Sequence, residues 1–187
     1  MSMQKKRPRV GVIGSGTEKY SQLSEPLGRW LAGQGCDLIN GGGGGVMEAV
    51  SQAFAESPGR KGNIIGVIPA SDSCDSPEGR SAYTPLQGYP NAWVDIPIYT
   101  HLPLSGASGK DIASRNHIII LSADMIVAFP GGPGTRSEIQ LALEYGKPLL
   151  ILNPNHEWDE FKNSRTPMME SQEEAIQWLA KNISQVG

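Results

Sequence analysis

Glycine clusters that follow short apolar runs constrain this sequence more than any other feature. The chain has 23 glycines, and three groups of them, at residues 14–16, 41–45 and 131–134, come directly or almost directly after apolar runs at 10–13, 36–40 and 125–129. A short β-branched apolar run bounded by glycine is typical of a buried strand that leads into a turn. The sequence therefore predicts several buried strands whose carboxyl ends carry glycine turns.

Helical patterns alternate with these strands along the chain. Apolar residues at positions 23, 27, 30 and 31 form one face of a helix, and further helices are expected over 46–54, 111–122, 138–145 and 173–183. Other short apolar runs, at 63–68, 93–99 and 149–152, predict additional strands. Strands that alternate with helices pair in parallel through right-handed crossovers. We therefore predict an α/β fold, a Rossmann-like three-layer sandwich with a mainly parallel sheet.

The length favours one domain over residues 1–187. A chain of 187 residues buries roughly two-thirds of its unfolded surface, which is enough for a core without metal or disulfide support. Residues 1–8 are expected to form an N-terminal arm. Residues 69–92 lack periodicity and are rich in Asp, Ser, Pro and Gly, so they are interpreted as a long loop or lid.

Composition argues against several classes of protein. The formal net charge is −3, and a nucleic-acid-binding surface is usually basic. No run approaches the roughly 18 apolar residues of a membrane helix, and no apolar segment of a signal peptide follows the N-terminus, so we expect a cytoplasmic protein. Cys36 and Cys74 form no CxxC pair, and the three histidines show no metal-ligand spacing, so no structural metal is expected.

The glycine turns predict a site for an anion. In parallel sheets ligands bind outside the carboxyl ends of the strands, where backbone amides and helix N-termini favour a phosphate. The turn at 131–135 is best placed, because a helix follows it at once. Tight packing alone is the alternative reason for each glycine cluster. The predicted phosphate contacts are Gly14, Ser15, Gly42, Gly43, Gly131, Gly132, Gly134 and Thr135.

Three common cofactor and nucleotide sites do not match. Lys19 stands where the GxGxxG motif of a dinucleotide site needs its third glycine, and Asn40 stands near where such a site carries an acid. Arg136 follows Thr135, so no Walker lysine is present. Nothing in the sequence suggests the lysine and pyridinium partner of a pyridoxal phosphate enzyme. We therefore expect no NAD, no PLP and no ATP hydrolysis.

Two motifs together resemble a known family. Residues 130–138, Pro-Gly-Gly-Pro-Gly-Thr-Arg-Ser-Glu, resemble the PGGxGTxxE signature of the Lonely-guy (LOG) family, and residues 41–48 are similar to its GGGxxGxM loop. The resemblance covers residues 9 to 153. Its enzymes hydrolyse the N-glycosidic bond of nucleoside 5′-monophosphates, whereas the related molybdenum cofactor carrier proteins bind a phosphorylated pterin. Members of the LOG family are often mislabelled as lysine decarboxylases.

The details of the motifs lie closer to the carrier branch. Ser114-Arg115-Asn116 stands where the hydrolases have Glu-Arg-Lys, and Val46-Met47-Glu48 stands where they prefer Leu-Met-Gly. The sequence GPGT followed by ExxLAL resembles the carriers, although the complete Pro-Gly-Gly resembles the hydrolases. The resemblance thus implies a carrier of molybdenum cofactor, with Arg115 and Asn116 beside its phosphate. The alternatives are a phosphoribohydrolase with catalytic Arg115 and Glu138, and a nucleotide sensor without turnover.

Individual residues keep alternative explanations at this point. Arg115 lies four residues after Asp111 and so can form a surface ion pair on a helix. Thr135 and Glu138 have the spacing of a capping box, in which Thr135 is the N-cap residue. The resemblance further implies a homodimer or homotetramer, with molybdoenzymes as recipients. The choice between carrier and hydrolase, the base or pterin contacts and the role of residues 71–92 stay open.

Overall fold

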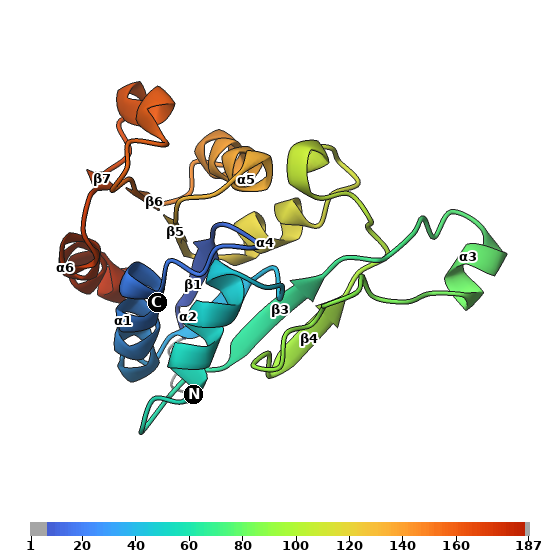
Figure 1. Ribbon diagram of the computed structural model, residues 1–187, viewed down its shortest axis with the longest axis horizontal. Coiled ribbons are helices and arrows are strands. Elements are labelled where there is room, and N and C mark those ends of the chain that lie inside the picture. Colours follow the sequence, from blue (N-terminus) through green and yellow to red (C-terminus); the bar gives the residue numbers. More distant parts are fainter. Residues whose placement is uncertain (1–6, 186–187) are drawn as a thin grey trace, which may run out of the picture.

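The computed structural model describes residues 7–185 and contains a seven-stranded sheet whose neighbouring strands all pair in parallel (Figure 1). The strands are arranged in the order β4-β3-β2-β1-β5-β6-β7. This sheet confirms the predicted α/β class. The strands are β1 (Arg9–Ile13), β2 (Asp37–Asn40), β3 (Ile64–Ile68), β4 (Ile96–Tyr99), β5 (Met125–Ala128), β6 (Leu149–Leu152) and β7 (Met168–Met169).

Helices cover both faces of this sheet and complete the three layers. One apolar cluster joins the sheet to α1 (Ser21–Gly33), α2 (Val46–Ala55) and α6 (Gln172–Asn182). A second cluster, on the other face, joins it to α4 (Asn116–Ser122) and α5 (Pro133–Glu144). The Rossmann-like three-layer prediction is therefore confirmed.

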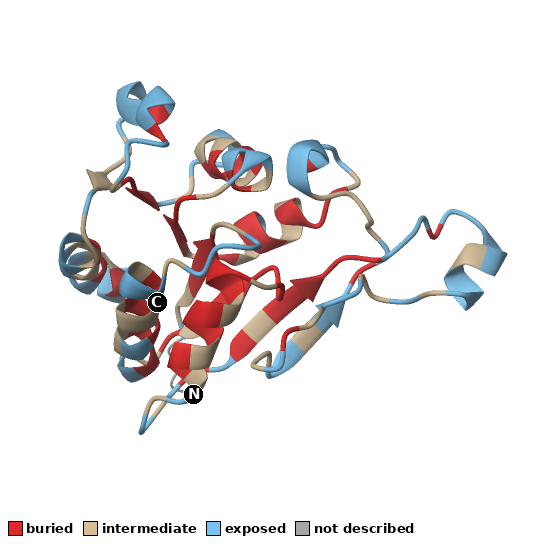
Figure 2. Cartoon of the chain, in the orientation of Figure 1, coloured by how far each residue is buried: buried red, intermediate tan, exposed pale blue. Residues whose placement is uncertain are grey.

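Side-chain alternation along β1 explains why its sequence is apolar throughout. Val10 and Val12 belong to the cluster beneath α1 and α2, whereas Ile13 belongs to the cluster beneath α4 and α5. All three side chains are at most 1% exposed. A central parallel strand is buried on both faces, so every position favours an apolar residue or glycine. Figure 2 shows the same burial across the middle of the sheet.

The strand order reverses at β1, and this reversal positions the site. The chain builds β1, β2, β3 and β4 in one direction and then crosses back to place β5 on the other side of β1. At such a switch point the turns after the two central strands lead to opposite faces and leave a crevice between them. The turns after β1 and β5 are two of the three predicted glycine turns.

The long segment between β3 and β4 projects from the body of the molecule (Figure 1). It contains a short helix, α3 (Pro77–Ser81), that the sequence analysis did not predict. The Ser76 side chain accepts a hydrogen bond from the Gly79 amide and caps this helix, and Pro77 occupies its first position. A bridge between Ala70 and Pro85 closes the base of the segment. Most of its surface is exposed (Figure 2).

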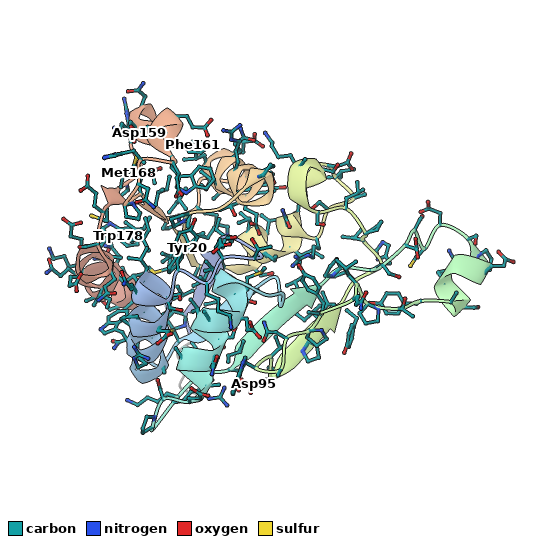
Figure 3. The ribbon with its side chains drawn as sticks, in the orientation of Figure 1. Tyr20, Asp95, Asp159, Phe161, Met168 and Trp178 are labelled. Atoms are coloured by element: carbon teal, nitrogen blue, oxygen red, sulfur yellow. The ribbon has the colours of Figure 1, made fainter. Side chains whose placement is uncertain are left out.

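Two predicted boundaries are wrong for a local reason. The strand expected from residue 93 begins at Ile96, because residues 92–93 form a turn and the Asp95 carboxylate accepts hydrogen bonds from the Ile64 amide and from Arg60 (Figure 3). The helix expected from Asp111 begins at Asn116, because the Asp111 carboxylate accepts from the Ala113 amide and closes a turn. Acidic side chains that bind backbone amides compete with regular structure in both places.

The remaining elements are short and were not predicted. They are the 3₁₀ turns η1 (Gly106–Ser108), η2 (Asp159–Ser164) and η3 (Ile183–Gln185), together with β7. Asp159 and Phe161 lie on η2 near the edge of the molecule (Figure 3). The predicted arm over 1–8 lies mostly outside the described residues. None of the helices within 7–185 combines the length and the apolar run needed to cross a bilayer.

Candidate functional site

A cavity of about 340 Å³ opens at the switch point of the sheet. Its walls come from the turns after β1 and β5, from the start of α4, from η1 and from the end of the projecting segment. Most of the residues predicted from the sequence line it: Gly14, Ser15, Arg115, Asn116, Gly132, Gly134, Thr135 and Glu138. Gly42, Gly43 and Gly131 lie outside its lining.

Backbone hydrogen bonds join the three glycine turns beside this cavity. The Ser15 amide donates to the carbonyl of Pro130 at 3.1 Å, and the Val46 amide donates to the carbonyl of Ser15 at 2.9 Å. The Ser15 hydroxyl in turn accepts from the Glu18 amide at 2.9 Å. Ser15 therefore connects the turn after β5 with the turn that precedes α2. The predicted convergence of the turns at one edge of the sheet is present.

The N-terminus of α5 faces the cavity without a side-chain cap. Gly132 is the N-cap residue, and its extended backbone leads into Pro133, the first helical residue. Thr135 stands inside the first turn, so the predicted capping box with Thr135 at the N-cap is wrong. Because Gly132, Gly134 and Thr135 line the cavity, the positive end of the helix dipole lies next to it.

Arg115 is a buried cation rather than a surface partner of Asp111. The residue is only 5% exposed, and its Nη1 donates to the carbonyl of Gly41 at 2.8 Å and to that of Val67 at 2.6 Å. Burial lowers the pKa of Arg115, but an arginine keeps its charge in proteins. The predicted alternative, an exposed ion pair with Asp111, is therefore wrong.

In the described part of the chain, one edge of the Arg115 guanidinium has no hydrogen-bond partner. Both backbone acceptors bind Nη1, whereas the buried Nε has no hydrogen-bond partner among the described residues. Nε and Nη2 lie side by side on the planar group and form the fork that binds two oxygens of a carboxylate or phosphate. Since Arg115 lines the cavity, it brings a buried positive charge with unused hydrogen-bond donors next to any oxyanion bound there.

Glu138 brings a carboxyl group with unusual protonation into the same cavity. It lies on α5, one turn after Thr135, and is half-buried. Burial raises the pKa of Glu138 to about 7, and the positive charge of Arg115 opposes this shift only in part. No ion pair within 4 Å joins Glu138 to Arg115 in the described part of the chain. Near neutral pH this carboxyl group is thus present in both protonation states.

The glycines at 41–45 make room for the side chains that reach the cavity. A Cβ atom at Gly41 would collide with the guanidinium of Arg115, and one at Gly43 would lie 2.6 Å from the ring of Tyr89. The two glycines therefore allow a buried arginine and a tyrosine to lie against the backbone of this turn. Direct contact of Gly42 and Gly43 with a phosphate stays a prediction.

Tyr89 is the main lining residue that sequence reasoning missed. Its ring centroid lies 5.5 Å from the guanidinium carbon of Arg115, and its side chain borders the cavity. Asn91 fixes the neighbouring backbone, because its amide donates to the Gly42 carbonyl at 2.7 Å and its side chain donates to the Gly43 carbonyl at 2.8 Å. The sequence predicted a long loop or lid over residues 69–92 but no individual contact residue within it.

A second cavity is larger and also borders a helix N-terminus, but no basic side chain of the described residues lines it. Its volume is about 630 Å³, and it lies between the start of α1 and the segments that precede α6, with Tyr20 on its wall (Figure 3). The charged residues of its lining, Glu170 and Glu173, are acidic and exposed. The smaller cavity at the switch point is therefore the better candidate for the functional site.

Sequence comparison relates the chain to one uncharacterized protein and to one enzyme. An uncharacterized protein of Archaeoglobus fulgidus is 34% identical over 148 residues, which cover 78% of this chain and 80% of that protein. A cytokinin riboside 5′-monophosphate phosphoribohydrolase of Rhodococcoides fascians is 29% identical over 150 residues. That match covers 76% of this chain and only 63% of the enzyme.

Structural comparison relates the fold to molybdenum cofactor proteins. The molybdenum cofactor binding protein of Rippkaea orientalis superimposes with a TM-score of 0.72 at 27% identity, over 96% of this chain and 99% of that one. The molybdenum cofactor carrier protein of Chlamydomonas reinhardtii gives a TM-score of 0.70 at 26% identity, with the same coverage. A family model matches residues 7–183, nearly the whole chain. On this match, the chain belongs to the SLOG cluster4 family.

Proposed function

We propose that this protein binds and carries molybdenum cofactor, and that the cavity at the switch point holds the phosphate of the pterin. The observation that carries the proposal is the unpartnered Nε and Nη2 edge of Arg115, a buried cation beside the uncapped N-terminus of α5. A phosphate would meet both positive groups at once.

Electrostatics favour an anion at this position. A buried positive charge without a counter-ion is energetically costly. An anion that accepts hydrogen bonds from it removes part of that cost. The helix N-terminus adds about 0.3–2 kcal/mol for a negative group in its first turn. Among the ligand contacts that we propose, Gly14, Ser15, Asn116, Gly132, Gly134 and Thr135 line the same cavity as Arg115.

The comparisons support a pterin cargo over other phosphorylated molecules. Proteins described as binding or carrying molybdenum cofactor share the fold of this chain over almost its whole length. The described residues lack a group of three or more His, Cys, Asp or Glu side chains arranged for a metal ion. In this proposal the protein holds the cofactor through its organic phosphate part, and molybdoenzymes receive it.

A phosphoribohydrolase is the second candidate, and Glu138 is the observation that favours it. A carboxyl group with a pKa of about 7 can exchange a proton at neutral pH, as general acid–base catalysis requires. Arg115 would hold the phosphate or ribose, and Glu138 would stabilise positive charge on the sugar or position water. The similarity of the chain to the phosphoribohydrolase of Rhodococcoides fascians supports this candidate.

One pair of assays separates the two candidates. The purified protein is incubated with AMP, and the mixture is analysed by chromatography for free adenine. In parallel, the protein is loaded with molybdenum cofactor and mixed with a molybdoenzyme that lacks its cofactor, whose recovered activity is measured. We expect protection and transfer of the cofactor without release of adenine.

The controls make each result decisive. Steady release of adenine that disappears in Glu138→Ala would establish the hydrolase and overturn the carrier. Arg115→Met should abolish protection of the cofactor, whereas Glu173→Gln, in the second cavity, should leave it unchanged. Binding of AMP without release, combined with no protection of the cofactor, would instead support a nucleotide sensor.

The assembly and compartment complete the proposal. We propose a homodimer or homotetramer, as the family resemblance implies, and a cytoplasmic location, as expected from the sequence. Light scattering on the purified protein measures the mass, and a monomer at micromolar concentration would contradict this part. The result does not affect the proposed binding of phosphate.

A further inference from the structure

We propose that Tyr89 is a positioning residue that holds the Arg115 guanidinium in the orientation needed to bind a phosphate. The projecting segment between β3 and β4 would then do more than cover the site as a lid. Through Tyr89, near its end, it would act as a brace that limits the movement of the Arg115 guanidinium. This inference rests on the proposed function and adds a residue that the family motifs do not include.

The first observation is that the side chains of Tyr89 and Arg115 both contact the turn at residues 41–45. The Arg115 Nη1 donates to the Gly41 carbonyl, and the Tyr89 ring lies against the position where Gly43 lacks a side chain. Asn91 ties the backbone after Tyr89 to the carbonyls of Gly42 and Gly43. The turn at 41–45 therefore fixes both the arginine and the aromatic ring.

The second observation concerns the freedom that remains to the guanidinium. The hydrogen bonds to Gly41 and Val67 both involve Nη1, so they hold one corner of the planar group. The ring of Tyr89, with its centroid 5.5 Å from the guanidinium carbon, occupies the space on one side of the group. Without the ring, water and other rotamers could occupy that space. The two hydrogen bonds and the ring together limit the directions in which the Nε and Nη2 edge can point.

The interaction needs the ring rather than the hydroxyl group. An aromatic ring that faces a guanidinium contributes about 0.5–2 kcal/mol, more when the pair is removed from water. No hydrogen bond from the Tyr89 hydroxyl is found within the described residues. Phenylalanine at this position should therefore preserve the effect, whereas leucine, which is apolar but smaller and has no ring, should abolish it.

The first test reads the position of Arg115 without any ligand. The Nε–H of Arg115 is buried, so its proton should exchange slowly and give an NMR signal, identified by its loss in Arg115→Met. We expect this signal to persist in Tyr89→Phe and to broaden or vanish in Tyr89→Leu. Tyr99→Leu, a matched loss of an exposed tyrosine on β4, should leave it unchanged. An unchanged signal in folded Tyr89→Leu would overturn the inference.

The second test measures binding of AMP and adenosine by calorimetry. We expect Tyr89→Leu to weaken AMP about tenfold, with little effect on adenosine, and to have no further effect in the Arg115→Met background. Additive losses, or equal losses for adenosine, would show that Tyr89 acts without Arg115 and would overturn the inference. If the wild type binds neither AMP nor molybdenum cofactor, the proposed function is contradicted instead. The NMR result would still show whether Tyr89 positions Arg115.

Discussion

The guanidinium of Arg115 donates to the backbone carbonyl of Gly41 at 2.8 Å, across 74 residues of sequence. This contact connects the start of α4 with the turn after β2 and places a positive charge between the central strands and the projecting segment. It also explains why residue 41 is a glycine, because a side chain there would occupy the space of the guanidinium. Gly41 thus makes room for the arginine, and Gly43 makes room for the ring of Tyr89.

Gly41→Ala should displace Arg115 and weaken binding of phosphate-bearing ligands. The added methyl group would collide with the guanidinium, and the backbone on either side is held by β2 and by Asn91. We expect AMP affinity, measured by calorimetry, to fall at least about tenfold, the scale of one lost charged contact. Gly33→Ala, where an added Cβ meets no atom within 4 Å, is the matched control. Equal affinity in both variants would exclude this role for Gly41.

Arg115→Lys should fail to replace the arginine although it keeps the charge. A lysine has no planar fork and cannot bond the two carbonyls from one nitrogen while it presents a second edge to the cavity. We expect protection of molybdenum cofactor to fall by about tenfold or more, the effect of one lost charge-assisted contact. Arg136→Lys, at an exposed neighbour, should change nothing. Full protection by the Arg115→Lys protein would show that charge alone suffices.

Asn91→Ala should loosen the base of the projecting segment. The change removes the donor to the buried Gly43 carbonyl and the acceptor of the Trp93 amide. An unsatisfied buried group costs about 1–3 kcal/mol, so the urea midpoint should fall accordingly. The Nε–H signal of Arg115 should broaden as well. Asn155→Ala, at an exposed position beside the second cavity, provides the comparison, and identical unfolding of the two variants would contradict the prediction.

The sheet could be predicted from the sequence, and the site only in part. Strands such as β1 and β6 are buried on both faces, so their apolar runs mark them directly. The start of α4 could not be predicted, because the Asp111 carboxylate closes a turn where the helical pattern continues. The orientation of Arg115 depends on carbonyls 48 and 74 residues away, which no local pattern encodes. Tyr89 lies in a segment without periodicity, so nothing distinguished it before the fold was known.

Glu138→Gln should change how the stability of the protein depends on pH. Burial raises the pKa of Glu138 from its usual value near 4.5 to about 7 in the folded protein. The folded state therefore holds this proton more tightly than the unfolded state, and stability is lost as pH rises from the lower value through the upper one. The full shift would correspond to about 3 kcal/mol, and water in the cavity should reduce it to about 2 kcal/mol.

Urea unfolding of the wild type and of Glu138→Gln at about pH 5 and about pH 8.5 measures this difference. Glutamine does not titrate, so the variant should gain stability relative to the wild type at the higher pH and match it more closely at the lower pH. Glu144→Gln, a change at the exposed end of the same helix, controls for charge on α5. A constant difference between the two proteins across this range would mean that the Glu138 carboxyl ionises freely in the cavity. In that case a proton-transfer role for Glu138 at neutral pH would lose its physical basis.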